Sequence, residues 1–128
     1  MLDEALVWAA RSGRTTALPV LVELGARVDA DPYRGMPPVW AAVNGRVDAV
    51  RMLVEVGADP NRRGTFGGAA HGEGVTALHL AAQAGRRETV VALLELGADP
   101  LVVDDLHGGT PLGWARFGGH DELADVLP

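Results

Sequence analysis

Several residue types on which enzyme chemistry depends are missing, or nearly so, from this chain of 128 residues. It contains no Cys, which excludes disulfides, thiol nucleophiles and cysteine-ligated zinc. All 11 basic residues are Arg, so no Lys is available for a Walker loop or a Schiff base. Ser12 is the only serine, and the residues around it lack the Gly-x-Ser-x-Gly pattern of a nucleophile elbow. Three large classes of enzyme mechanism are thereby excluded.

The charge balance and the hydropathy pattern narrow the class of protein further. The chain carries 17 acidic and 11 basic residues, with a formal net charge of −6 at pH 7. This sign disfavours nucleic acid and anionic membranes, because both require a basic surface. No apolar run approaches the roughly 18 residues that cross a bilayer, and the N-terminus is acidic where a secretory signal would carry Lys or Arg. The sequence predicts a cytoplasmic globular protein that is monomeric by itself and binds neither nucleic acid nor membranes.

An internal repeat runs along the chain. Residues 40–60 align with residues 80–100 at an offset of 40, and both copies share an Ala-Ala pair, a Gly-Arg pair and a terminal Gly-Ala-Asp-Pro. Residues 8–29 fit the same frame 32 residues earlier, and residues 108–127 fit it 34 residues later. Self-similarity at such a period is typical of a solenoid, in which each copy buries its apolar face against its neighbours.

Each copy has the pattern of two short helices. The first runs through alanines to a glycine that ends the helix in the left-handed conformation, at Gly13, Gly45, Gly85 and Gly119. The second carries apolar residues at helical spacing and ends at Gly-Ala-Asp. Because alanines occupy the middle of the first helices, we expect successive copies to approach closely there, with the bulkier second helices behind them.

The motifs in these copies resemble the ankyrin repeat. The stretches Gly-Val-Thr-Ala-Leu-His-Leu-Ala-Ala (74–82) and Gly-Gly-Thr-Pro-Leu-Gly-Trp-Ala (108–115) are similar to its signature Gly-x-Thr-Pro-Leu-His-x-Ala-Ala. The resemblance implies an all-α solenoid of about four helix-turn-helix repeats joined by β-hairpin-like loops, with one elongated loop between repeats 2 and 3. It also implies a single domain over 1–128, with repeats at 2–34, 35–73, 74–107 and 108–128, the last incomplete.

Prolines depart from this pattern at two places. Pro38 replaces a leucine of the other copies and follows Pro37, so we expect both in the first turn of a helix, where backbone N–H groups lack partners anyway. Pro19 falls in the second helix of the first copy. It is tolerable if that helix starts at Thr15 or Thr16, which leaves Pro19 in the first turn.

The glycines of Gly72-x-Gly74-x-x-Ala77 have the outline of a dinucleotide-binding turn, with acids about 20 residues further on. Such a turn requires a buried strand before it. The preceding residues are polar and glycine-rich, so the sequence predicts no strand there, and the repeat already accounts for the acids Glu95 and Asp99. Dinucleotide binding is therefore disfavoured.

The larger offset between the second and third copies predicts a long finger from Arg62 to Glu73. The finger is either a neutral surface insertion, since lengthening an exposed loop costs little, or a contact loop. The second interpretation depends on Arg62, Arg63, Phe66 and His71, which offer charge and an exposed aromatic ring among flexible glycines.

Trp8, Trp40 and Trp114 occupy one repeat position, which Leu80 fills in the remaining copy. The ankyrin resemblance places this position on the first helix, toward the concave side. The rings either pack between adjacent first helices or contact a partner, since tryptophan is enriched at binding hot spots.

The resemblance implies further contact positions, before the glycine that ends each first helix and at the tips of the hairpins. The first group is Arg11, Ser12, Val43, Asn44, Gln83, Ala84, Phe117 and Gly118, and the second is Asp31, Tyr33, Arg34, Asp104, Asp105 and His107. Among these, Tyr33, Arg34 and Phe117 have side chains that suit an interface.

The histidines raise a separate alternative. The resemblance gives His79, together with Thr76, the structural role of tying the hairpin to the start of a helix. A metal site is the competing interpretation, with candidate ligands His71, Glu73, His79, His107 and His120. No pair of these residues has the i, i+4 spacing of a zinc-binding helix, so we expect neither a metal nor a cofactor.

The sequence as a whole predicts a non-enzymatic module that binds a partner protein through the concave face of its first helices and its fingers. The net acidic charge predicts a basic patch on that partner. Two alternatives stay open: a regulatory or targeting domain or subunit of a larger enzyme or complex, and a small-molecule or metal site around the long loop.

Overall fold

The computed structural model describes residues 1–31, 35–66 and 73–128, which fold into two layers of helices. The first layer holds α1 (Leu2–Ser12), α3 (Pro37–Val43), α5 (Ala77–Gln83) and α7 (Pro111–Phe117). The second layer holds α2 (Ala17–Glu23), α4 (Val47–Glu55), α6 (Arg87–Glu95) and the short 3-10 helix η1 (Asp121–Asp125). Nothing in these described segments is a helix long and apolar enough to cross a membrane.

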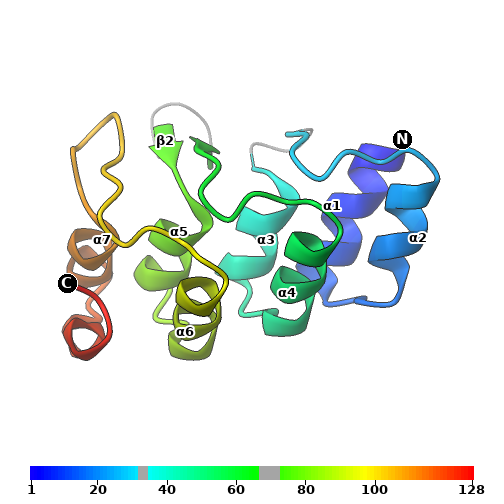
Figure 1. Cartoon of the computed structure of the whole chain (residues 1–128). Coiled ribbons are helices and arrows are strands. Elements are labelled where there is room, and N and C mark those ends of the chain that lie inside the picture. Colours follow the sequence, from blue (N-terminus) through cyan, green and yellow to red (C-terminus); the bar gives the residue numbers. More distant parts are fainter. Residues whose placement is uncertain (32–34, 67–72) are drawn as a thin grey trace.

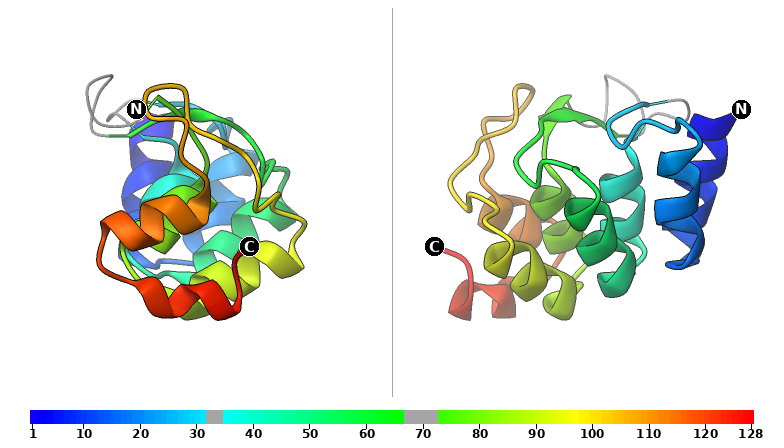
Figure 2. Two further views of the ribbon diagram at one scale, coloured as in Figure 1. Left: turned by 90° about the vertical axis from the view of Figure 1, so that its left-hand side faces the viewer. Right: turned by 45° about the vertical axis from the view of Figure 1, so that its right-hand side comes forward.

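The helices form a stack of pairs. In the first layer α1 contacts α3, α3 contacts α5 and α5 contacts α7, and a second-layer helix backs each of them. Figure 1 shows the two termini at opposite ends of this stack, with the loops that join the pairs along one edge and the turns within each pair along the other. The left view of Figure 2 shows the stack from the end that carries α7 and η1, with the two layers side by side. The all-α solenoid predicted from the sequence is confirmed.

The core lies between the layers and between successive pairs. Its fully buried aliphatic side chains include Leu6, Leu18, Val39, Val50, Leu53, Leu78, Val90 and Leu93. In the first layer, alanines have no exposed surface, at Ala10, Ala41, Ala42, Ala81 and Ala82. Because these side chains are single methyl groups, adjacent first helices approach closely, as the sequence predicted. Each buried leucine or valine stabilises the fold by roughly 1.5–3 kcal/mol.

The helix ends follow the sequence pattern. Gly13, Gly45, Gly85 and Gly119, which end the first helices, have φ values of 73°, 68°, 71° and 84°. These values lie in the left-handed region that favours glycine, because other residues place their Cβ too close to the backbone there.

The prolines also lie where they were predicted. Pro37 and Pro38 are the first two residues of α3, so neither removes a hydrogen bond of the helix. The helix α2 begins at Ala17 after Thr16, which leaves Pro19 in its first turn.

One prediction about the finger was wrong. Strands β1 (Gly64–Thr65) and β2 (Glu73–Val75) pair antiparallel at the base of the long loop, and β2 leads through Thr76 into α5. The strand escaped prediction because only its last residues are buried, so no apolar alternation marks it. It belongs to a hairpin and not to a parallel βαβ unit, so it does not revive the dinucleotide interpretation.

Candidate protein interface

The three tryptophans share one repeat position but differ in exposure. Trp8 on α1 is 55% exposed and Trp114 on α7 is 9% exposed, while Trp40 on α3 is half-buried. Helix α1 is the end of the first layer and adjoins only α3 within that layer. Trp40 and Trp114 are each covered by a loop. Trp8 is therefore the tryptophan that presents most of its surface to solvent.

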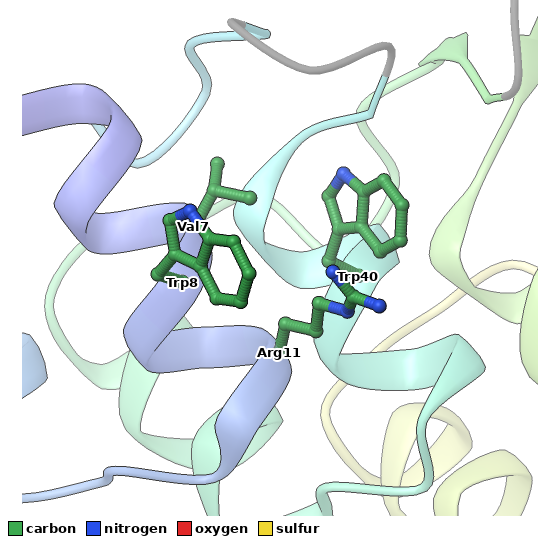
Figure 3. A pocket seen from close by; sticks show the side chains of 4 residues that line it. All are labelled: Val7, Trp8, Arg11 and Trp40. Atoms are coloured by element: carbon green, nitrogen blue, oxygen red, sulfur yellow. The ribbon is translucent and has the colours of Figure 1, made fainter.

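A pocket of about 300 Å³ lies between α1 and α3, lined by Val7, Trp8, Arg11 and Trp40. Figure 3 shows the two indoles on opposite sides of this pocket, with Arg11 reaching from α1 toward Trp40. The Arg11 Cζ atom lies 5.2 Å from the ring centroid of Trp8 and 5.2 Å from that of Trp40. Both contacts are within the range of cation–π attraction, which holds the guanidinium in the pocket.

Trp40 is fixed from the finger side. The ring of Phe66 meets it edge-on, with the ring centroids 5.0 Å apart. Gly35 lies so close to both rings that a Cβ atom there would be 2.8 Å from Trp40 Nε1. That nitrogen is buried, and it has no acceptor within the described part of the chain.

Phe66 was predicted as an exposed ring at the end of a flexible finger, and the exposure was wrong. Its side chain is half-buried and packs against the core beside Trp40. The physical reason is that an aromatic ring in a polar loop gains more from an apolar neighbour than from water. Phe66 therefore supports the wall of the pocket.

The two arginines of the finger are held within the chain. Arg62 lies 3.5 Å from the carboxylate of Asp29. Arg63 donates to the backbone oxygens of Gly74 at 3.2 Å and Val103 at 3.0 Å, and it also contacts the Asp105 carboxylate. Both side chains remain about half exposed. The two arginines connect the three successive loops between helix pairs, which we call fingers: residues 24–36, 56–76 and 96–110. The sequence had suggested instead that both arginines would be free to contact a partner.

Asp104 was predicted at an exposed hairpin tip, but it is buried. One carboxylate oxygen accepts from the backbone N–H groups of Leu106 (3.1 Å) and His107 (2.7 Å). The other accepts from the backbone N–H of Gly109 (2.7 Å) and from Trp114 Nε1 (3.0 Å). The carboxylate thus shapes the loop over α7, and Trp114, which we predicted as a partner contact, is committed to this internal hydrogen bond.

The protonation of Asp104 follows from these contacts. Burial by itself would raise the pKa of its carboxyl group, but the hydrogen bonds from Trp114 and from the backbone of His107 and Gly109 outweigh burial and lower the pKa to about 2. Asp104 is therefore ionised throughout the neutral range.

Two models of the ankyrin-repeat family match the sequence, one described as ankyrin repeats in three copies over residues 2–64 and the other as ankyrin repeats in many copies over residues 39–94. The chain belongs to the ankyrin-repeat family. The chain also resembles several curated proteins over part of its length. It is 46% identical over 55 residues to the ARF GTPase-activating protein GIT1 of Homo sapiens, which is 43% of this chain and 7% of that protein.

A viral relative gives a similar match. The IkB-like protein of African swine fever virus is 44% identical over 54 residues, which is 42% of this chain and 23% of that protein. The chain thus spans less than a quarter of the length of either relative. These partial matches carry no activity from one protein to the other.

The ankyrin hairpin tie predicted for His79 is present. The backbone N–H of Thr76 donates to His79 Nδ1 at 3.1 Å, and His79 Nε2 lies 3.0 Å from the backbone oxygen of Gly109 in the next repeat. Since Nδ1 accepts, Nε2 carries the proton and the ring is neutral. Burial lowers the pKa of His79 below its ordinary value, against the smaller opposing effect of Gly109.

A contact that recurs between neighbouring ankyrin repeats was missed by the sequence interpretation. Arg46, in the turn after α3, donates through Nε to the backbone oxygen of Arg11 at 3.1 Å. Arg86, in the turn after α5, donates through Nε to the backbone oxygen of Val43 at 3.0 Å. Each guanidinium binds a carbonyl at the C-terminal end of the preceding first helix, where the helix dipole favours a cation.

Glycines make room for these arginines. A Cβ atom on Gly13 would lie 3.0 Å from the Cδ atom of Arg46, and one on Gly45 would lie 3.1 Å from the Cδ atom of Arg86. The Gly-Arg pair that recurs in the aligned repeats is the signal that could have revealed this contact, because the two residues serve adjacent repeats.

The remaining aromatic and charged contact candidates divide into two groups. Phe117, at the end of α7, is 86% exposed, so its side chain is accessible to a partner. Tyr33, Arg34 and His71 lie outside the described residues. Within the ranges described, no group of three His, Asp or Glu side chains is arranged to hold a metal ion.

Proposed function

We propose that this ankyrin-repeat chain is a non-enzymatic protein-interaction module whose partner docks on the first-helix face, at the pocket formed by Val7, Trp8, Arg11 and Trp40. The observation that carries the proposal is the 55% exposure of Trp8 at the rim of this pocket of about 300 Å³. A large aromatic side chain beside a concave apolar site is the kind of anchor that dominates binding energy at protein interfaces.

The pocket supports this function because it exists before a partner arrives. Its walls belong to helices α1 and α3, and Phe66 and Gly35 fix the ring of Trp40 from behind. A preformed surface loses little conformational entropy on association, so more of the contact energy remains as affinity. The fingers, which Arg62 and Arg63 connect through hydrogen bonds and ion pairs, add rigidity at the edge of the same face.

We propose Phe117 as an outer contact and the half-exposed Arg62 and Arg63 as rim contacts. Phe117 ends the last helix of the layer that begins with Trp8, and it is the most exposed of the aromatic side chains described. Both arginines form ion pairs within the chain, but about half of each side chain is still exposed to solvent. Rim charges of this kind alter association rates more than final affinity.

The test compares Trp8→Ala with Leu24→Ala in affinity capture from the source organism. Leu24 is 63% exposed just after α2, so it is a matched apolar control on the second layer. We expect Trp8→Ala to weaken capture of a specific partner by about 30-fold, as for a hot-spot residue, and Leu24→Ala to leave it unchanged. Circular dichroism establishes that both variants are folded. Equal capture by both variants would remove the proposed interface.

A second candidate is a regulatory or targeting role within a larger enzyme or complex. The matches support it, because the similar stretch makes up only 7% of the ARF GTPase-activating protein GIT1 and 23% of the IkB-like protein. Mass spectrometry of the chain isolated from its source organism tests it. A large assembly that survives Trp8→Ala would favour this role over the proposed pocket.

A further inference from the structure

We infer that the first-helix face binds an acidic peptide segment with one apolar side chain: the apolar group enters the pocket beside Trp8, and the carboxylates meet a row of arginines. This arginine row is defined as Arg11, Arg14, Arg46 and Arg86. The inference rests on the proposed function and specifies the chemistry of the partner. It reverses the basic partner that the net charge alone predicts.

The arginines of the chain fall into two groups. Ten of the eleven are described, and five of these contact a carboxylate within the chain, namely Arg27, Arg51, Arg62, Arg63 and Arg87. The other five form no ion pair within the described part of the chain, and they are Arg11, Arg14, Arg46, Arg86 and Arg116. No acid occurs among residues 32–34 and 67–72 that could neutralise them. The second group includes the whole arginine row.

Most acids of the chain lie away from the turns that carry the arginine row. No Asp or Glu occurs in four stretches that contain most of the first helices and the turns that follow them, which are 6–22, 35–47, 74–87 and 106–120. All 17 acids therefore lie in the first turn of α1, in the second helices or in the fingers. Asp48 and Glu88 come two residues after Arg46 and Arg86. They lie in the first turns of α4 and α6, where the helix dipole favours an acidic side chain. The chain has net charge −6, yet these four stretches carry cations without acids. Glu4 lies on the same side of α1 as Val7, Trp8 and Arg11, but its carboxylate is paired with the N-terminal amine at 2.7 Å.

The arginine row is continuous with the pocket. The Arg46 side chain donates a hydrogen bond to the backbone oxygen of Arg11 in the preceding repeat, and Arg86 donates in the same way to the backbone oxygen of Val43. Each uses only its Nε–H in these contacts, and all four members of the row are exposed. Arg46 and Arg86 lie one repeat apart, in the turns from α3 to α4 and from α5 to α6. Figure 1 shows these turns on the edge of the stack opposite the loops that join the helix pairs. Guanidinium groups so placed suit bidentate binding of carboxylates.

The pocket itself selects against a cationic partner. Arg11 already lies 5.2 Å from both indole rings, in the position that a Lys or Arg of a partner would seek. A second cation would have to displace Arg11 and then face its charge. An apolar side chain meets Val7 and the two rings without that penalty, and an acidic neighbour in the same segment pairs with Arg11.

The observations favour an acidic peptide over a nucleic acid. A nucleic acid presents phosphates along its whole length and would meet the acids of the fingers and second helices, whose repulsion opposes binding. A short acidic segment can place its charges on the arginine row alone.

The experiment titrates the protein with synthetic peptides that lack Trp, followed by the fluorescence of its own tryptophans. The first peptide contains about ten residues of Asp and Glu with one central Phe. In the second peptide Ser replaces the Phe, and in the third Lys replaces the acids and the Phe is kept. An oligothymidylate is the fourth probe. Each titration is repeated above and below about 0.15 M salt, where the Debye length is about 8 Å.

Two pairs of substitutions carry the same change in net charge. We expect Arg46→Gln with Arg86→Gln to weaken the acidic Phe peptide about fivefold, from two exposed charge contacts. The control, Arg51→Gln with Arg87→Gln, removes two arginines of the second layer and should leave the affinity unchanged. Trp8→Ala should weaken binding at least tenfold, and the Ser peptide should bind at least tenfold more weakly than the Phe peptide. Higher salt should weaken binding as well.

Other outcomes overturn the inference in distinguishable ways. If the Lys peptide binds at least as well as the acidic one and depends on Trp8, the acidic partner is wrong but the proposed interface stands. If the acidic peptide binds equally well to Trp8→Ala and to both double variants, its site lies elsewhere. If oligothymidylate binds and Arg46→Gln with Arg86→Gln weakens that binding, the ligand of the arginine row is a nucleic acid and not an acidic peptide. Failure of all the peptides to bind also overturns the inference, while affinity capture with Trp8→Ala still tests the proposed function.

Discussion

Replacing Asp104 by Asn tests whether its carboxylate organises the loop over α7. The substitution keeps the shape of the side chain and removes its charge. Four donors point at the two carboxylate oxygens, two at each. Asn has only one acceptor oxygen, so its NH₂ group must face two N–H donors, whichever way the amide is turned.

The expected loss follows from the pKa of Asp104. Its folded-state pKa of about 2 lies below the ordinary value of 3.8. This difference corresponds to about 2 kcal/mol of stability at neutral pH. Because the folded pKa is the lower one, the stabilisation is fully present above about pH 4 and is lost as the pH falls toward 2. For a chain of this length, 2 kcal/mol lowers the melting temperature by about 8 °C.

The assay is thermal and urea unfolding of wild type and Asp104→Asn between about pH 7 and pH 3. The gap in unfolding free energy should narrow by about 1 kcal/mol over this range, because the wild type loses part of its carboxylate stabilisation. Asp105→Asn is the matched control, since the exposed carboxylate of Asp105 contacts Arg63 and such a pair contributes at most about 1 kcal/mol. A gap of constant size from pH 7 to pH 3 would refute the role of the charge.

The fold could be predicted because each repeat states the same pattern again. Each repeat contains residues that the local backbone requires: a glycine where the first helix ends and alanines where first helices pack together. Because this pattern recurs, the repeats together identify the fold where a single copy would be ambiguous. The strand β2 could not be predicted this way. Its residues Glu73 and Val75 pair with β1 on a loop that occurs once, so neither periodicity nor repetition marks them.

The site was harder to predict because exposure depends on residues from other parts of the chain. The repeat makes Trp8, Trp40 and Trp114 equivalent, yet Phe66 covers the second and the loop shaped by Asp104 covers the third. A glycine-rich loop suggested that Phe66 would be exposed, and a polar hairpin suggested the same for Asp104. In both cases a tertiary partner, an indole ring, determined the burial, and only the folded chain reveals that partner.

Two further predictions concern contacts between repeats. Gly45→Ala and Gly108→Ala place a Cβ at similar φ values of 68° and 63°, but only the first Cβ meets a neighbour, Arg86 Cδ at 3.1 Å. Urea unfolding should therefore show about 1 kcal/mol more loss for Gly45→Ala, from the disturbed Arg86 hydrogen bond, and equal losses would contradict this contact. His79 is neutral in the fold because burial lowers its pKa below 6.5, whereas the unfolded chain takes up a proton near that pH. The contribution of neutral His79 to the free energy of unfolding is thus present above pH 6.5 and is lost as the pH falls below that value. His79→Gln should flatten the decline in unfolding free energy between about pH 7 and pH 5, and parallel profiles for variant and wild type would show that His79 does not cause it.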